Sequence, residues 1–164
     1  MPLKSFAPLF TKELSPAAVY QNDALGLLVF LDQFPATRGH LLVVPREIVD
    51  PWEALSAERQ LLLDALANTM ALHLQKSLKP APLRVGQLIS GYGVKHAHRH
   101  VVPSYERGDM QKVLDPQRAQ PGNRASEAEL AEVLAEISFT PEQKRRLDAR
   151  LQHLDTILKR LSLP

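Results

Sequence analysis

Three histidines, His96, His98 and His100, occupy alternate positions in the sequence. The chain has 6 histidines, so half of them fall in this one segment. Side chains alternate between the two faces of an extended strand, and these three are therefore expected to project from one face. Near neutral pH, imidazole can act as a nucleophile, a proton carrier and a cationic donor to phosphate. This row is the strongest indication of what the protein does.

The histidine row is open to three interpretations. As a structural cluster it would place cationic groups side by side, which costs stability unless an anion binds there. As a metal site it would use His-x-His as a zinc pair, with a further ligand from His40 or Asp32. However, His96 and His100 would be about 13 Å apart at Cα, from a rise of ~3.3 Å per residue. In phosphate chemistry the central imidazole attacks phosphorus and its neighbours donate to the phosphate oxygens. We favour phosphate chemistry and expect no metal ligands.

A sheet and one long helix are expected to position this row. Apolar runs predict strands over residues 17–20, 25–32, 40–44, 83–90 and 94–102, the last of which holds the three histidines. The first three are compatible with an antiparallel meander. Ser56 is a good helix N-cap, and apolar residues recur after it at helical spacing as far as Leu78, which predicts a helix of about five turns. Residues 104–125 are polar and proline-rich, and no regular structure is expected there.

Two further helices are predicted after this segment. Ser126 and Glu129 form a capping-box pattern that opens a helix through residue 137, and Thr140-Pro141 repeats the signature. The last helix carries a narrow apolar stripe suited to packing on the domain or on a partner, formed by Leu147, Leu151, Leu154, Leu158 and Leu161. The basic residues beside the stripe are interpreted as a solvated face rather than a nucleic-acid contact. We expect a domain over residues 1–137 and a helical extension over residues 138–164.

The composition excludes several classes of protein. At 164 residues and 45% hydrophobic residues, one domain with a real core is expected. A net charge of +2 is too small to indicate nucleic-acid binding by itself. The absence of cysteine excludes disulfides and thiolate metal sites. No apolar run is long enough to span a membrane and no secretory signal is visible, so we expect a cytoplasmic protein.

Two blocks of the sequence resemble the histidine-triad (HIT) family. The family motif is His-x-His-x-His followed by two hydrophobic residues, and residues 96–102, HAHRHVV, match it. The second block runs from Pro16-Ala17 through Phe30-Leu31-Asp32 to Gly39-His40 and Pro45. The two blocks stand in the family's order and at about its separation, so the resemblance covers roughly residues 6–137.

The resemblance implies a fold and an activity. The family fold is α+β, with a five-stranded antiparallel sheet and a long helix, to which this chain would add its C-terminal helical extension. Members bind nucleotides, and many are homodimers. They are hydrolases or transferases that act at the α-phosphate of nucleotide conjugates, such as dinucleoside polyphosphates or nucleoside phosphoramidates. No built-in cofactor is implied, although a polyphosphate substrate can arrive with Mg²⁺.

The resemblance also implies roles for individual residues. His98 would be the nucleophile and form a nucleotidyl-histidine, His100 would donate to the phosphate, and His96 would orient the nucleophile. His40 would complete the histidine constellation, and Asp32 matches the ribose-binding acidic position. The apolar wall of the base pocket would be formed by Phe30, Leu31 and Leu42, with Phe10 as a weaker candidate.

The stretch before the triad departs from the family pattern. Many hydrolytic members have Gly-Gln-Ser/Thr-Val-x-His there, whereas Tyr92 and Gly93 replace the glutamine and the hydroxyl in this chain. We place both among the substrate-binding positions and expect Tyr92 and Lys95 to offer replacement phosphate contacts. Arg99 stands where a hydrophobic residue is usual, which indicates a changed dimer contact or a solvent-exposed position. Two alternatives therefore stay open, a nucleotide-binding module with little catalysis and a histidine metal-binding protein.

Overall fold

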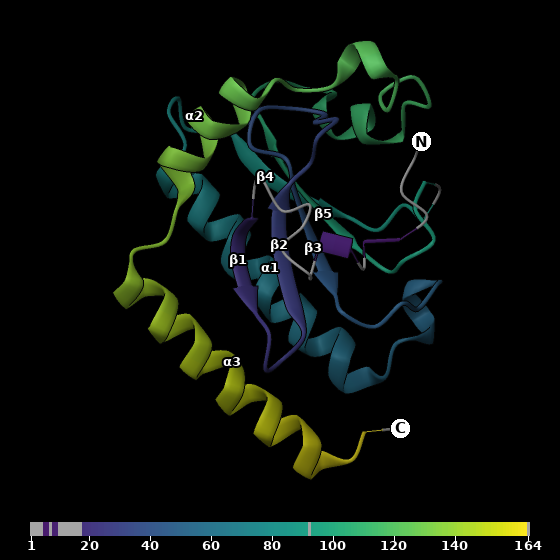
Figure 1. Ribbon diagram of the computed structural model, residues 1–164, viewed down its shortest axis with the longest axis vertical. Helices are drawn as coiled ribbons and strands as arrows, with labels where there is room; N and C mark the ends of the chain where they lie inside the picture. The colour runs from purple at the N-terminus through teal and green to yellow at the C-terminus, as the bar shows by residue number, and fades with distance from the viewer. Residues whose placement is uncertain (1–4, 7, 10–17, 92, 164) are drawn as a thin grey trace.

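The centre of the molecule is a five-stranded antiparallel sheet with the strand order β1-β2-β3-β5-β4 (Figure 1). The computed structural model describes residues 5–6, 8–9, 18–91 and 93–163. The strands are β1 (Ala18–Asn22), β2 (Leu27–Leu31), β3 (Leu41–Pro45), β4 (Arg84–Leu88) and β5 (Arg99–Ser104). The predicted α+β fold and the meander of the first three strands are confirmed. Strand β5, which carries His100, lies between β3 and β4.

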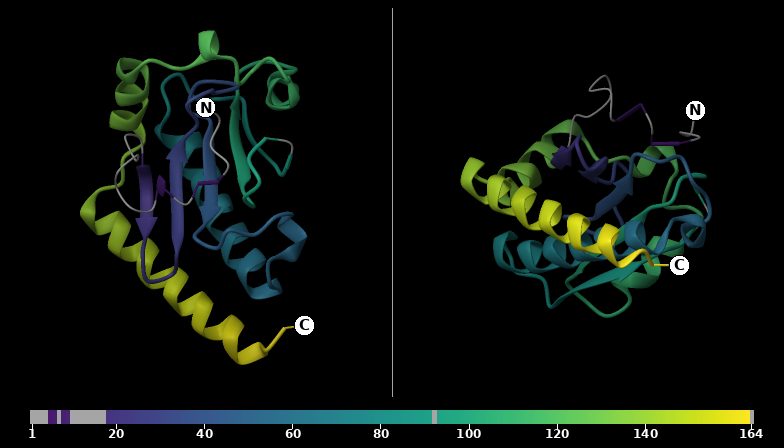
Figure 2. Two further views of the ribbon diagram at one scale, coloured as in Figure 1. Left: turned by 45° about the vertical axis from the view of Figure 1, so that its right-hand side comes forward. Right: turned by 90° about the horizontal axis from the view of Figure 1, so that it is seen from below.

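The continuous apolar run of β2 is explained by cover on both faces of the sheet, since every residue of this strand is buried. One face lies under helix α1 (Ala57–Ser77), which begins where the Ser56 hydroxyl accepts a hydrogen bond from the backbone N–H of Arg59. The residues of β2 alternate between this main core and a second apolar cluster on the opposite face, with Leu27, Val29 and Leu31 in the first and Leu28 and Phe30 in the second. Figure 2 shows α1 and the last helix on one side of the sheet and the described N-terminal residues on the other.

The two C-terminal helices are α2 (Glu127–Ile137) and α3 (Pro141–Leu161), and both begin with the predicted capping box. The apolar stripe of α3 faces the domain as far as Leu158, because Leu147, Leu151 and Leu158 are buried in the same core as the sheet and α1. Leu161 at the end of the predicted stripe is exposed. Polar contacts add to this packing, since the Tyr20 hydroxyl donates to Asp148 Oδ1 at 2.6 Å. The extension therefore shares one core with the sheet. Its outer face carries ion pairs such as those of Arg145 and Arg146 with Glu142.

The strand prediction for the histidine row is wrong in its boundaries. Strand β5 begins at Arg99, so only His100 of the three histidines lies in it. Before that point the backbone N–H of Ala97 donates to the carbonyl of Val49 at 2.6 Å, and that of His96 donates to Val94 at 2.9 Å. These bonds turn the chain out of the β ladder. His96 and His98 consequently lie in a bend that leads into the strand.

Arg99 lies on the α1 side of the sheet. It forms an ion pair with Asp64 of α1, its guanidinium lies 5.0 Å from the ring centre of Trp52, and it donates to Gln87 Oε1 at 3.1 Å. The charge that departs from the family pattern is thus matched inside this chain. It is neither left to solvent nor unpaired.

Residues 105–125 contain more structure than the sequence indicated. Two short 3-10 helices, Asp109–Leu114 and Pro121–Asn123, occupy the segment that was expected to be irregular. The buried carboxylate of Asp109 accepts hydrogen bonds from the backbone of Tyr105 and Glu106, which closes the first turn. Proline and polar residues therefore form compact turns here, for which no helical periodicity is needed. No helix among the described residues has both the length and the apolar character that a membrane span requires.

Candidate active site

A row of paired residues crosses the sheet and fixes one wall of the site. Phe30 of β2 pairs with Leu42 of β3, Leu42 pairs with His100 of β5, and His100 pairs with Leu88 of β4. Residues paired in an antiparallel ladder point to the same face. Phe30, Leu42 and His100 therefore share the face opposite α1, which we call the site face.

The central histidine is held in one tautomer. The Nδ1 atom of His98 lies 2.7 Å from the backbone oxygen of His96. Because a carbonyl only accepts hydrogen bonds, Nδ1 carries the proton and the lone pair is at Nε2. Burial lowers the pKa of His98 below its ordinary value of 6.5, so the ring is neutral at neutral pH. A neutral imidazole with an unprotonated Nε2 is the form that can attack phosphorus.

His40 and His100 form a second chain of ring hydrogen bonds whose direction is set by the backbone. The N–H of Ala36 donates to His40 Nδ1 at 3.0 Å, so the proton of His40 is on Nε2. That Nε2 lies 2.9 Å from His100 Nδ1 and donates to it. The proton of His100 is consequently on Nε2, which lies 3.1 Å from the Ser90 hydroxyl. Burial lowers the pKa of His40 to about 3 and that of His100 to about 2.

This arrangement gives the two neighbouring histidines complementary roles. The ring centres of His98 and His100 are 4.9 Å apart. One ring offers a lone pair at Nε2, and the other offers an N–H donor. Ser90 was not among the predicted site residues, and it places a hydroxyl beside His100 although the usual hydroxyl position is occupied by Gly93. A serine only a few residues before that position was the available sequence signal.

The ring of His96 is occupied by the backbone. Its Nδ1 accepts the N–H of Phe6 at 3.2 Å, and its Nε2 donates to the carbonyl of Pro45 at 2.7 Å. Both ring nitrogens of His96 are therefore bonded to the backbone, and neither is available to a phosphate. Its contact with His98 runs through the main-chain carbonyl described above.

Asp32 lies at the end of β2 beside the histidines, with a partner that sequence reasoning missed. Its Oδ1 accepts the N–H of Phe34 at 2.9 Å, and its Oδ2 accepts from Arg118 Nη1 at 2.8 Å. The Oδ2 atom is also 3.7 Å from His40 Nδ1. This is a contact between two acceptors, because Nδ1 already accepts a hydrogen bond from a backbone N–H. Arg118 comes from the polar segment, where a single arginine gives no sequence signal for a site.

The apolar wall contains two of the three predicted base-pocket residues. Phe30 and Leu42 lie on the site face with Leu28, Val44, Phe6 and Leu9, whereas Leu31 points to the opposite face and joins the main core. The Phe6 ring lies 5.4 Å from Phe30 and 5.2 Å from His98, centre to centre. Phe6 and Leu9 were missed because a short apolar segment near the start of the sequence has no diagnostic spacing.

The remaining predicted positions are less informative. Phe10 and Tyr92 lie outside the described residues. Gly93 is exposed, and a Cβ at that position would meet open space. Lys95 is exposed as well. The structure thus brings together His98, His100, His40, Asp32, Phe30 and Leu42, and it keeps Leu31 on the other face.

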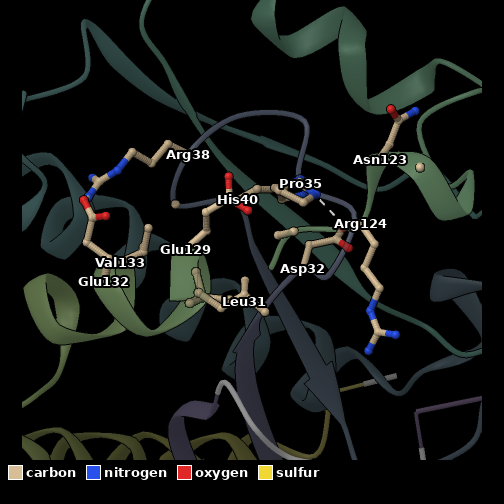
Figure 3. A pocket seen from close by; sticks show the side chains of 14 residues that line it. Leu31, Asp32, Pro35, Arg38, His40, Asn123, Arg124, Glu129, Glu132 and Val133 are labelled. Carbon is tan, nitrogen blue, oxygen red and sulfur yellow. Dashed lines mark hydrogen bonds and ion pairs between the residues drawn. The ribbon is translucent and has the colours of Figure 1, made fainter. Parts of the chain in front are cut away.

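A cavity of about 540 Å³ opens beside Asp32 and His40. Its apolar lining includes Leu31, Leu130 and Val133, and its polar rim is contributed by the loop before β3 and the start of α2. Figure 3 shows Asp32 and His40 adjacent in this wall, with Arg38 extending toward Glu132. In the described part of the chain, His96, His98 and His100 are not among the residues that line it.

Asp32, His40 and His100 are close enough to be considered as metal ligands, since one ligand atom from each lies within 4.8 Å of the others. Their lone pairs are already engaged, however. His40 Nδ1 accepts a hydrogen bond from the backbone N–H of Ala36, His100 Nδ1 accepts one from His40 Nε2–H, and Asp32 Oδ2 is paired with a guanidinium. A cation here would have to displace these donors, so the donor set fits a metal poorly.

Comparison with known proteins agrees with this fold and site. The sequence profile of the HIT domain matches residues 11–107, and this chain belongs to the HIT family. An uncharacterized HIT-like protein of Saccharolobus solfataricus is 33% identical over 106 residues, which cover 62% of this chain and 75% of that protein. An uncharacterized 16.1 kDa HIT-like protein of Mycoplasma pneumoniae is 42% identical over 82 residues. That match spans only 57% of the Mycoplasma protein's length and 48% of this chain.

Solved structures show the same fold at low sequence identity. A HIT-like protein from Bartonella henselae superposes with a TM-score of 0.65 at 20% identity, covering 80% of this chain and 91% of that one. A histidine triad nucleotide-binding protein from Sulfolobus tokodaii superposes with a TM-score of 0.56 at 19% identity, covering 94% of this chain and 93% of that one. At this identity the likeness establishes the fold, and function has to be argued from the site.

Proposed function

We propose that this protein is a nucleotide hydrolase or nucleotidyltransferase that acts at the α-phosphate of a nucleotide conjugate through a covalent intermediate on His98. The observation that carries the proposal is the hydrogen bond from His98 Nδ1 to the backbone oxygen of His96. It leaves Nε2 unprotonated next to the N–H donor of His100. Family membership supports the same chemistry.

The first step forms a bond between His98 Nε2 and phosphorus while the bond from phosphorus to the leaving group breaks. The leaving group departs with that electron pair and takes a proton from solvent. The nucleotidylated ring is then cationic, and its Nδ1–H is stabilised by the His96 carbonyl. The His100 Nε2–H, which donates to the Ser90 hydroxyl in the free protein, exchanges that acceptor for the phosphoryl oxygen as the charge on this oxygen grows.

The second step releases the enzyme. A water molecule, or another acceptor in a transferase, attacks phosphorus as the Nε2–phosphorus bond breaks. The electron pair returns to Nε2, and the proton of the attacking water is lost to solvent. Hydrolysis thus yields a nucleoside monophosphate and the neutral ring with which the cycle began. The chain's own residues supply the nucleophile and the donor, and a Mg²⁺ ion takes part only as a complex with a polyphosphate substrate.

Covalent trapping tests this proposal. The protein is mixed with a dinucleoside polyphosphate or a nucleoside phosphoramidate labelled at the α-phosphorus and quenched in denaturant. We expect an acid-labile label on the wild-type protein and none on His98→Ala. His153→Ala is the matched control, because His153 is exposed on α3, away from the site. Equal labelling of His98→Ala would refute the mechanism.

A second candidate is a nucleotide-binding module with little catalysis, and one observation favours it. His98 is only 6% exposed, and the Phe6 ring lies against it. The ring therefore has little surface open to a nucleotide in this conformation. Nucleotide binding without label transfer in the trapping experiment would support this candidate over the enzyme.

We also propose that the protein forms a homodimer through the edge of the sheet at β4. This strand has a partner on one side only, namely β5. Near it, Leu83 is 78% exposed and Leu72 of α1 is 65% exposed. An uncovered edge with apolar neighbours is suited to pairing with a second copy. Sedimentation should give twice the monomer mass, and Leu72→Glu should reduce it.

A further inference from the structure

None of the histidines of the site carries a permanent positive charge. His40, His98 and His100 have lowered pKa values, and His40 and His100 are neutral well below neutral pH. A nucleotide phosphate carries negative charge, and binding it in a buried site without a cation is costly. The cation of the site must therefore come from another residue.

Arg118 is such a cation, and the fold holds it rigidly. Its Nη1 donates to Asp32 Oδ2 and to the carbonyl of Phe34, and its Nε donates to the carbonyl of Val113 at 3.4 Å. The segment that carries it is fixed at both ends. Buried Val113 anchors one side, and the N–H of Ala125 donates to the carbonyl of Gln33 at 2.8 Å on the other.

One nitrogen of the Arg118 guanidinium is available to a ligand. Nη2 is an NH₂ group, and within the described part of the chain it donates no hydrogen bond. The Arg118 side chain is 17% exposed, so a ligand can reach it. Arg118 lies beside the histidines, because its partner Asp32 Oδ2 is 3.7 Å from His40 Nδ1, and one atom each of Asp32, His40 and His100 lies within 4.8 Å of the others.

We propose that Arg118 is the phosphate-binding cation of this site and donates through Nη2 to an anionic oxygen of the bound nucleotide. The inference rests on the proposed function and extends it, because it makes the phosphate the part of the ligand that this segment recognises. A planar guanidinium suits this task, since it can face an oxyanion while its other edge stays on Asp32. It supplies a donor that the glutamine and hydroxyl of the usual family pattern would otherwise provide.

Paired binding measurements test the inference. The four common nucleoside 5′-monophosphates and their parent nucleosides are titrated calorimetrically into the wild type, Arg118→Gln and Arg118→Lys. For the monophosphate that binds best, we expect Arg118→Gln to weaken binding about 10- to 100-fold, as for loss of a charged hydrogen bond. The parent nucleoside should lose less than about twofold. Arg118→Lys keeps the charge but lacks the planar guanidinium, so its affinity for the monophosphate should lie between those of the wild type and Arg118→Gln.

Control measurements separate this role from a structural one. Arg107→Gln is the matched control, because Arg107 is an exposed arginine earlier in the same segment that does not line the cavity beside Asp32 and His40, and it should bind like the wild type. Thermal unfolding confirms that each variant is folded. An equal loss for nucleoside and monophosphate would overturn the inference and leave Arg118 as a residue that only positions Asp32; an unchanged affinity for both would overturn it as well. Covalent trapping on His98 is a separate test of the proposed function. If His98 is labelled but Arg118→Gln has no selective effect on the monophosphate, the role of Arg118 is refuted and the proposed function stands.

Discussion

The buried neutral histidines predict that the protein loses stability on mild acidification. A group whose pKa is lowered in the folded state binds its proton more readily in the unfolded chain, so stability is full above the unfolded pKa and falls as pH drops below it. For His40 the window runs from 6.5 down to about 3. For His100 it runs from 6.5 down to about 2. Both rings are therefore still neutral in the folded protein at pH 5, while the unfolded chain is already protonated.

The size of the effect follows from these two windows. A histidine with an unfolded pKa of 6.5 that stays neutral in the folded state costs about 2 kcal/mol at pH 5 relative to pH 7. His40 and His100 together give about 4 kcal/mol. His96 and His98 add to this in the same direction, because burial lowers their pKa values as well. A loss of this size is a large part of the ~5–15 kcal/mol that holds a typical domain together.

Urea unfolding at pH 7, pH 6 and pH 5 measures the effect. We expect the free energy of unfolding to fall by about 4 kcal/mol or more over this range. In His40→Gln the amide can replace both hydrogen bonds without titrating, and the fall should shrink by about 2 kcal/mol. A free energy of unfolding that is flat or rises between pH 7 and pH 5 would refute the assignment of neutral, buried rings.

Three further predictions concern single side chains. Phe6→Ala should expose His98 and increase the rate at which diethyl pyrocarbonate modifies it, as followed by mass spectrometry; an unchanged rate would show that Phe6 does not cover Nε2. Ser90→Ala removes the acceptor that orients His100 and should lower turnover about two- to tenfold, the worth of one neutral hydrogen bond, whereas Ser90→Thr should retain it; equal rates for both would contradict the role. Leu151→Ala should lower the free energy of unfolding by about 2–5 kcal/mol, because Leu151 is buried against the main core. Leu161→Ala is its control, since Leu161 is 60% exposed and should change stability by less than about 0.5 kcal/mol; similar losses would show that α3 does not pack as described.

The parts of the fold that follow a simple period could be predicted. The apolar run of β2, the spacing of α1 and the capping boxes of α2 and α3 each express a local rule, and the structure confirms all of them. The bend at His96 and His98 could not be predicted. It depends on hydrogen bonds such as that between Ala97 and Val49, which join segments that are distant in the sequence.

The site residues also divide into those that local patterns could predict and those that depend on contacts between distant segments. His98, His100, His40 and Asp32 were found from their types and their family pattern, and they lie together. Arg118 and Phe6 were missed because their contribution depends on how an irregular segment returns to the sheet. Leu31 and Phe30 are adjacent in the strand and point to opposite faces, so Phe30 shares the site face with Leu42 while Leu31 lines the cavity beside Asp32; the role of either residue in holding a base stays a prediction.

The ring protons of this site are set by main-chain groups of Ala36, Phe6, Pro45 and His96. A peptide group is the same whichever side chain it carries. Replacing the residues that alternate with the histidines can thus leave the reactive tautomer untouched, provided that the path of the chain is kept. A one-residue insertion between His96 and His98 would separate the His96 carbonyl from the His98 ring, so the nucleophile would lose the group that fixes its tautomer while every imidazole remained in the sequence.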